Sequence, residues 1–212
     1  MMKRRHFQQT ALASLATLPA LAAWAQGVAH RELARPASVE APPPRIEVVD
    51  FFWYGCPHCN AFAPLLESWV ERLPADVSVR RAPVSFQPSF AAHQRLYFTL
   101  EAMGQVQALH RRVFASIHVG RQRLDTQASV FEWARAQKDL DTARFEQLFA
   151  SFGIATKAQR ATQLQEAYGI TGVPALGVAG RYVVDGGTAG DMTRALAEVD
   201  RLVDQLRRAR RG

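Results

Sequence analysis

The residues best placed to do chemistry are the chain's two cysteines, in the segment Cys56-Pro57-His58-Cys59. They would make a poor structural disulfide, because disulfide stabilisation grows with the length of the loop that is closed. A zinc site needs further ligands, and the sequence has neither a second cysteine pair nor a histidine pair at ligand spacing. A covalent haem site needs histidine directly after the second cysteine, where Asn60 stands. Redox chemistry is the interpretation that remains.

The elements expected around the pair favour redox chemistry. Residues 46–53 are rich in β-branched and aromatic side chains with scarcely any alternation, which predicts a strand buried on both faces. A helix can begin at Pro57, because proline is tolerated at the first helical position. Cys56 would then lie beside unpaired backbone N–H groups at the positive end of the helix dipole, and both favour a thiolate. Cys59, one turn further along, should be more buried and keep its proton.

The rest of the chain indicates an α/β protein with an all-helical insertion. Residues 77–84 predict a second strand, which completes a βαβ unit with the first strand and the helix. Apolar residues then recur at helical spacing, before a hairpin around Gly180 and Arg181 and a last amphipathic helix. The expected parts are a signal peptide at 1–25, an extended lead-in at 26–45, a βαβ part at 46–86, a helical insertion at 87–168 and a ββα part at 169–212.

The amino terminus is typical of a cleaved secretory signal. A basic start is followed by an Ala/Leu-rich run that ends in Ala23-Trp24-Ala25, with small residues where a signal peptidase reads. A membrane anchor is the alternative, but the apolar run is shorter than the ~20 residues of a span and contains Pro19. Arg4 and Arg5 also suit twin-arginine export, although we favour the general secretory (Sec) route. We therefore expect a soluble protein outside the cytoplasm.

The net charge of +7 does not indicate nucleic-acid binding by the folded body. The remaining basic and acidic residues balance once the basic residues of the two ends are set aside. Those end residues are Lys3, Arg4, Arg5, Arg207, Arg208, Arg210 and Arg211. The 48% hydrophobic content is that of an ordinary globular protein.

The motif and its surroundings resemble the DsbA family of bacterial periplasmic thiol:disulfide oxidoreductases. The resemblance rests on residues 51–59 (Phe-Phe-Trp-Tyr-Gly-Cys-Pro-His-Cys), on Gly-Val-Pro-Ala at 172–175 before a hairpin, and on the helical block between them. It implies a thioredoxin fold with a helical insertion and an oxidase role towards reduced, newly exported proteins in the periplasm. It also implies reoxidation by an inner-membrane quinone-linked partner of the DsbB type. We further expect a monomer without cofactor.

The same resemblance assigns roles to individual residues. Cys56 would be the exposed sulfur that forms the mixed disulfide with substrate, and Cys59 the resolving cysteine. His58 would interact electrostatically with the Cys56 thiolate. Pro174, after Val173, would be a cis-proline that faces the disulfide and presents backbone to the substrate.

Asp50 stands where family members carry an acid beneath the disulfide, more often glutamate. Burial should raise the pKa of its carboxyl, which could then relay a proton to Cys59. Trp53, Tyr54 and Pro57 carry no charge. With the Val173–Pro174 loop they should surround Cys56 with an apolar, uncharged surface that binds unfolded substrates.

Two other functions stay open at this point. A disulfide isomerase or reductase could use the same fold, although isomerases usually carry an amino-terminal dimerisation domain for which the lead-in is too short. A peptide-binding holdase could carry the cysteine pair incidentally. Substitution of both cysteines by serine separates an oxidase, which would lose its activity, from a holdase, which would not.

Overall fold

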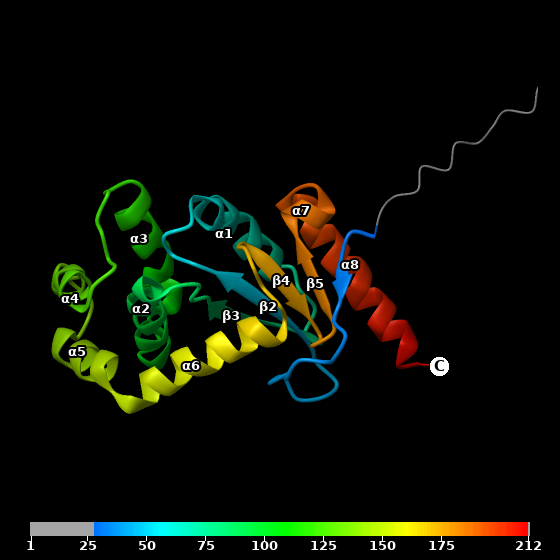
Figure 1. Ribbon diagram of the computed structural model, residues 1–212, viewed down its shortest axis with the longest axis horizontal. Helices are drawn as coiled ribbons and strands as arrows, with labels where there is room; N and C mark the ends of the chain where they lie inside the picture. Colours follow the sequence, from blue (N-terminus) through cyan, green and yellow to red (C-terminus); the bar gives the residue numbers. More distant parts are fainter. Residues whose placement is uncertain (1–27, 212) are drawn as a thin grey trace, which may run out of the picture.

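A computed structural model describes residues 28–211, so the expected signal peptide at 1–25 lies outside the described part. A mixed sheet with helices on both faces forms one part of the molecule, and a block of helices lies at one end of it (Figure 1). This is the α/β architecture with a helical insertion that the sequence predicts. Among the described residues, no helix is both long and apolar enough to cross a membrane.

The strand that leads to the cysteines lies inside the sheet. Strand β2 (Ile46–Phe52) is buried along its whole length, as its lack of alternation predicts. It pairs in parallel with β3 (Val77–Pro83) and antiparallel with β4 (Ala175–Val178). Strand β5 (Tyr182–Asp185) and the short β1 (Arg31–Glu32) complete the order β1-β5-β4-β2-β3. The βαβ and ββα units therefore join in one sheet through β2 and β4.

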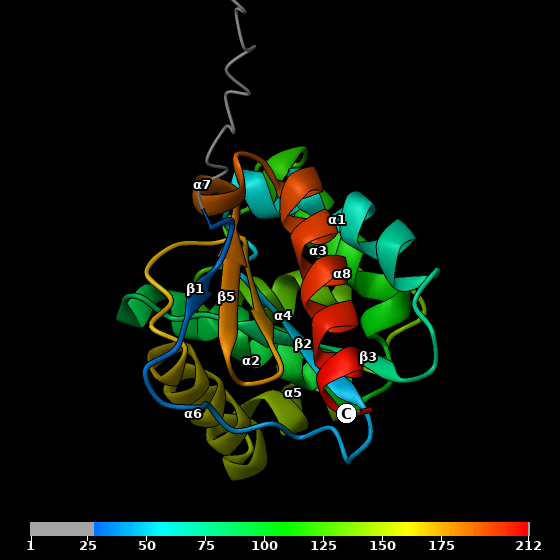
Figure 2. The same ribbon diagram turned by 90° about the vertical axis from the view of Figure 1, so that its right-hand side faces the viewer.

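Helices cover both faces of this sheet (Figure 2). On one face, α1 (Pro57–Val70) and α8 (Met192–Ala209) pack on β-strand side chains such as Ile46 and Val48. On the other, α6 (Phe152–Ala167) and the tyrosine that follows it pack on Val49 and Phe51. The alternating faces of β2 thus contribute to two separate apolar layers.

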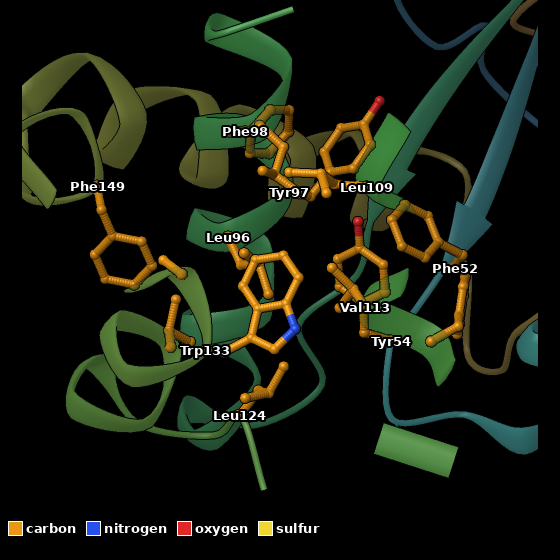
Figure 3. Packing of buried hydrophobic residues seen from close by; sticks show 14 of the residues in the cluster. Phe52, Tyr54, Leu96, Tyr97, Phe98, Leu109, Val113, Leu124, Trp133 and Phe149 are labelled. Carbon is orange, nitrogen blue, oxygen red and sulfur yellow. The ribbon is translucent and has the colours of Figure 1, made fainter. Parts of the chain in front are cut away.

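The insertion has a core of its own, which reaches the residues before the cysteines. It contains a 3₁₀ turn, η1 (Pro88–Phe90), and helices α2 (Ala91–Ala102), α3 (Val106–His118), α4 (Gln127–Arg135) and α5 (Thr142–Ala150). Their buried side chains enclose Phe52 and Tyr54 from the end of β2 (Figure 3). The helical block is therefore packed directly against the segment that holds the cysteine pair.

Some elements differ from the sequence expectation. The sequence indicates only a short helix over 164–168, whereas α6 begins at Phe152, capped by the Ser151 hydroxyl. A one-turn helix, α7 (Gly186–Ala189), follows β5, where the Asp185 side chain caps it. The expected extended lead-in contains β1, which adds to the sheet edge through backbone pairing with β5. Backbone pairing of this kind leaves no apolar periodicity to detect.

Gly177 in β4 provides a test of this packing. A Cβ atom there would lie 2.5 Å from the Tyr168 ring, whose hydroxyl accepts a hydrogen bond from the Gly180 N–H. Gly177→Ala should lower the free energy of unfolding by about 1–3 kcal/mol, because the buried ring cannot move without strain. Gly172→Ala is the control, since a Cβ there would meet nothing within 4 Å. Denaturant unfolding measures both, and equal stabilities of the two variants would contradict the packing described.

Candidate active site

The turn between β2 and α1 places Cys56 at the start of the helix. Cys56 is the N-cap residue of α1, with extended backbone, and Pro57 occupies the first turn. Position 55 requires glycine, because the Cβ of any other residue would lie 2.3 Å from the Trp53 ring. The Cys59 backbone N–H points back to Cys56 Sγ at 3.4 Å. An N-cap side chain normally accepts this type of bond through oxygen, and here the sulfur accepts it.

A second loop contacts the same sulfur. The Val173–Pro174 peptide bond, which precedes β4, is cis, as predicted. The Val173 carbonyl oxygen lies 3.4 Å from Cys56 Sγ. Because β4 pairs antiparallel with β2, the start of β4 lies beside the end of β2. This pairing brings together two segments that are more than a hundred residues apart.

The two cysteines have opposite acidities. The pKa of Cys56 is lowered to about 6, chiefly because it accepts a hydrogen bond from the Cys59 thiol, with smaller contributions from the backbone N–H groups of Cys59 and His58. The pKa of Cys59 is raised, because its thiol proton is held in the bond to Cys56 and the side chain is buried. At neutral pH the pair therefore carries one negative charge, on Cys56, as the helix position predicts.

The expectation of an exposed Cys56 sulfur is wrong. Residue Cys56 is only 7% exposed, and Cys59 is 2% exposed. The covering atoms include the Val173 carbonyl, which belongs to a loop distant in sequence. Cys56 is still more exposed than Cys59, as the sequence predicts.

His58 lies at the exposed start of α1, two residues after Cys56. Its charge lowers the pKa of Cys56, as the predicted electrostatic interaction requires, but it is the smallest of the contributions. The hydrogen bonds to the sulfur matter more than this histidine.

Asp50 is buried in β2, with 3% of the residue exposed. Burial raises the pKa of its carboxyl to about 6, partly opposed by the positive charge of Arg81. Arg81 is the register partner of Asp50 on β3, and its Nε lies 3.8 Å from Asp50 Oδ2. Asp50, Arg81 and Cys59 line one small cavity of about 10 Å³, which is about the space that one water molecule needs. Sequence reasoning missed Arg81, because strand register cannot be deduced from the arginine alone.

Tyr54 does not form part of the substrate surface, contrary to expectation. It is 0% exposed, and its hydroxyl lies 2.8 Å from His110 Nδ1. The Tyr54 carbonyl oxygen is 2.9 Å from His118 Nε2, so two histidines without an expected role fix the segment before Cys56. Its ring lies within the packed core of the helical block (Figure 3). Trp53 is half-buried and stacks on Phe90 with ring centroids 3.8 Å apart.

A groove of about 640 Å³ runs from His58 and the cis-proline loop towards α7. Residues 169–174 form one continuous part of its wall, which suits an extended chain. Arg31, Asp185 and Asp191 also line it, so the expectation of an uncharged surface is wrong for this groove. The sequence predicts only an extended lead-in around Arg31 and no role for this residue. Within residues 28–211, no group of three or more His, Cys, Asp or Glu side chains could hold a metal ion.

Comparison with known proteins finds the same pattern. Residues 47–197 match the model of the DSBA-like thioredoxin domain. The chain is 41% identical over 193 residues, 91% of each chain, to a Bordetella parapertussis protein named "Thiol:disulfide interchange protein DsbA". A Pseudomonas aeruginosa relative of the same name is 38% identical over 209 residues, 97% of this chain and 98% of the relative. The crystal structure of Pseudomonas aeruginosa DsbA aligns with a TM-score of 0.82 at 38% identity, covering 87% of this chain and 95% of that one.

The order of contributions to Cys56 acidity can be tested in the reduced protein. Ultraviolet absorbance of the thiolate should give a Cys56 pKa of about 6. Cys59→Ala removes the largest contribution, so it should raise that pKa by more than His58→Ala does. If His58→Ala has the larger effect, the histidine and not the hydrogen bonding is the main cause.

The raised Asp50 pKa makes a prediction for stability. Because the pKa of about 6 in the folded state exceeds the ordinary aspartate pKa of 3.8, the charged carboxylate destabilises the folded state above pH 6 but not below pH 4. At about 1.4 kcal/mol per pKa unit, the full effect is up to about 3 kcal/mol. The oxidised Asp50→Asn variant should therefore have a higher free energy of unfolding at pH 7 than the unaltered oxidised protein. This difference should disappear between pH 6 and pH 4. A difference that does not change with pH would contradict the assignment.

Proposed function

Since the chain belongs to the family of DSBA-like thioredoxin domains, we propose that its Cys56–Cys59 disulfide oxidises reduced proteins in the periplasm. The protein is a thiol:disulfide oxidoreductase. The observation that carries the proposed direction of transfer is the acidic Cys56 at the start of α1, beside the cis-proline loop. A thiolate stabilised in the reduced form makes the disulfide form a better oxidant.

The exchange proceeds in two steps. A substrate thiolate attacks Cys56 Sγ, so a new S–S bond forms while the Cys56–Cys59 bond breaks, and Cys59 leaves with the electron pair. A second substrate thiolate then attacks the substrate sulfur of this mixed disulfide, and Cys56 leaves as a thiolate. The substrate loses two electrons and two protons overall, and the enzyme's disulfide becomes a dithiol.

Asp50 supplies a proton to Cys59 in this scheme. The departing Cys59 has a raised pKa and needs a proton at once, whereas Asp50 titrates at about 6 and lines the same cavity. A group with a pKa near the working pH is suited to give and regain a proton. Arg81 keeps the Asp50 pKa from rising further, which makes it a positioning residue for this relay.

Substrate binding is assigned to backbone more than to side chains. Val173 and Pro174 present the wall of the groove next to Cys56, and a peptide laid along it can use main-chain hydrogen bonds regardless of its sequence. Pro57 and the half-buried Trp53 complete the apolar surroundings. Tyr54 supports these residues from beneath.

The location and the partner belong to the same proposal. The family relationship supports a periplasmic protein delivered by a cleaved amino-terminal signal, with the general secretory route favoured. Each turnover leaves the enzyme as a dithiol, so a two-electron acceptor is needed. An inner-membrane, quinone-linked reoxidase of the DsbB type meets that need, and the enzyme acts as a monomer without cofactor.

Oxidation of a fluorescent peptide with two free thiols tests the proposal. The oxidised protein should convert the peptide to its disulfide stoichiometrically, and Cys56→Ser with Cys59→Ser should abolish the reaction. The same double variant in an aggregation assay separates the holdase alternative, because a holdase does not need the cysteines. A protein that rearranges scrambled disulfides faster than it oxidises dithiols would instead be an isomerase.

A further inference from the structure

Arg31 brings a positive charge into the groove that begins at the active site. It lies on β1 opposite Val183 of β5, and its side chain lines the groove together with the loop at residues 169–174. One guanidinium nitrogen, Nη2, donates to the Tyr168 and Gly169 carbonyl oxygens at 2.7 and 3.1 Å. The guanidinium is therefore held in place at the end of α6, where that loop begins.

The rest of the guanidinium is available to a ligand. Its Nε and Nη1 groups make no hydrogen bond within residues 28–211, and no carboxylate of that part forms an ion pair with Arg31. The two carbonyl oxygens that it contacts are neutral, so they orient the cation without cancelling its charge. A fixed guanidinium with free donors is well suited to bind a carboxylate.

Of the two carboxylates that line the groove, only Asp191 has an ion-pair partner among the described residues. The Asp185 carboxylate accepts the Thr188 backbone N–H at 2.8 Å, as the cap of α7. The Asp191 carboxylate accepts the Arg194 N–H at 2.8 Å and forms an ion pair with the Arg194 side chain at 3.5 Å. His58 lines the groove at the active-site end. Arg31 is thus the arginine of this groove, held by neutral carbonyl oxygens and without a carboxylate partner among the described residues.

The distance along the groove defines which part of a substrate would meet this charge. Gly169, bound by Arg31, precedes Val173, beside Cys56, by four positions. The loop bends at residues 172–174 and Gly169 has a left-handed backbone, so these four positions span at most the length of four extended residues, at about 3.3 Å each. A side chain within about four residues of the substrate cysteine therefore reaches the guanidinium.

We propose that Arg31 is a specificity-determining residue that favours reduced substrates with Asp or Glu within a few residues of the attacking cysteine. This inference rests on the proposed oxidase function and deepens it. It adds a preference for particular substrate side chains to a groove that we propose binds the substrate main chain.

Matched dithiol peptides test the preference. Peptides that differ only by Glu, Gln or Lys at positions two to four from the attacking cysteine, on either side, are oxidised by the full chain. We expect a kcat/KM about two- to fivefold higher for the best Glu peptide than for its Gln counterpart, the range of a partly exposed ion pair. Arg31→Gln should abolish this ratio, and Arg31→Lys should keep part of it. Arg181→Gln is the control, because this exposed arginine lies at the β4–β5 turn and pairs with Glu32.

The outcomes separate this inference from the proposed function. Equal rates for Glu and Gln peptides, or a preference for Lys, would overturn the role of Arg31 while leaving the oxidase intact. If Arg31→Gln slows all peptides by the same factor, the residue only positions the loop, and the specificity proposal fails. If no peptide is oxidised by the unaltered protein, the proposed function itself fails. A ratio that disappears in Arg31→Gln and persists in Arg181→Gln supports the inference.

Discussion

The negative charge on Cys56 at the first turn of α1 is the interaction on which the other features of the site depend. Hydrogen bonds from Cys59 and from backbone N–H groups stabilise it, and they exist only while the helix begins at this residue. The buried strand β2 fixes where the helix begins. Its pairing with β4 brings the Val173 carbonyl against the same sulfur. The helix start lowers the pKa of Cys56, and the strand pairing places the cis-proline loop beside it.

The same arrangement explains why the second cysteine needs help. The bond that stabilises the Cys56 thiolate keeps the proton on Cys59, and burial adds to this effect. A departing Cys59 cannot readily take a proton from bulk water when the residue is 2% exposed. The Asp50 carboxyl lines the same small cavity as Cys59. Its burial raises its pKa to about 6 and so destabilises the folded state at neutral pH. The pKa of Cys56 is thus set by local geometry, and the proton donor that we propose for Cys59 comes from the preceding strand.

Local signals in the sequence were sufficient for much of this structure. The unalternating pattern of residues 46–53 and the proline after Cys56 predict the strand, the helix start and the site of the thiolate. The cis geometry of Pro174 was predicted through the family resemblance, since its own sequence context gives no such signal. Contacts between distant segments could not be foreseen: Tyr54 is buried because the insertion packs over it, and Arg81 meets Asp50 through strand register. Arg31 reaches the groove through pairing of only two residues.

The most direct test is the free energy of unfolding of the reduced and oxidised forms as a function of pH. A lowered folded pKa stabilises the reduced form above that pKa, and the contribution is lost as pH falls through about 6. With an unfolded pKa near 9 it amounts to about 1.4 kcal/mol at pH 7 and almost nothing at pH 5. The account predicts a reduced form that is more stable than the oxidised form at pH 7, with an advantage that shrinks by about this amount towards pH 5. An oxidised form that is the more stable at pH 7, or a difference that stays constant with pH, would contradict it.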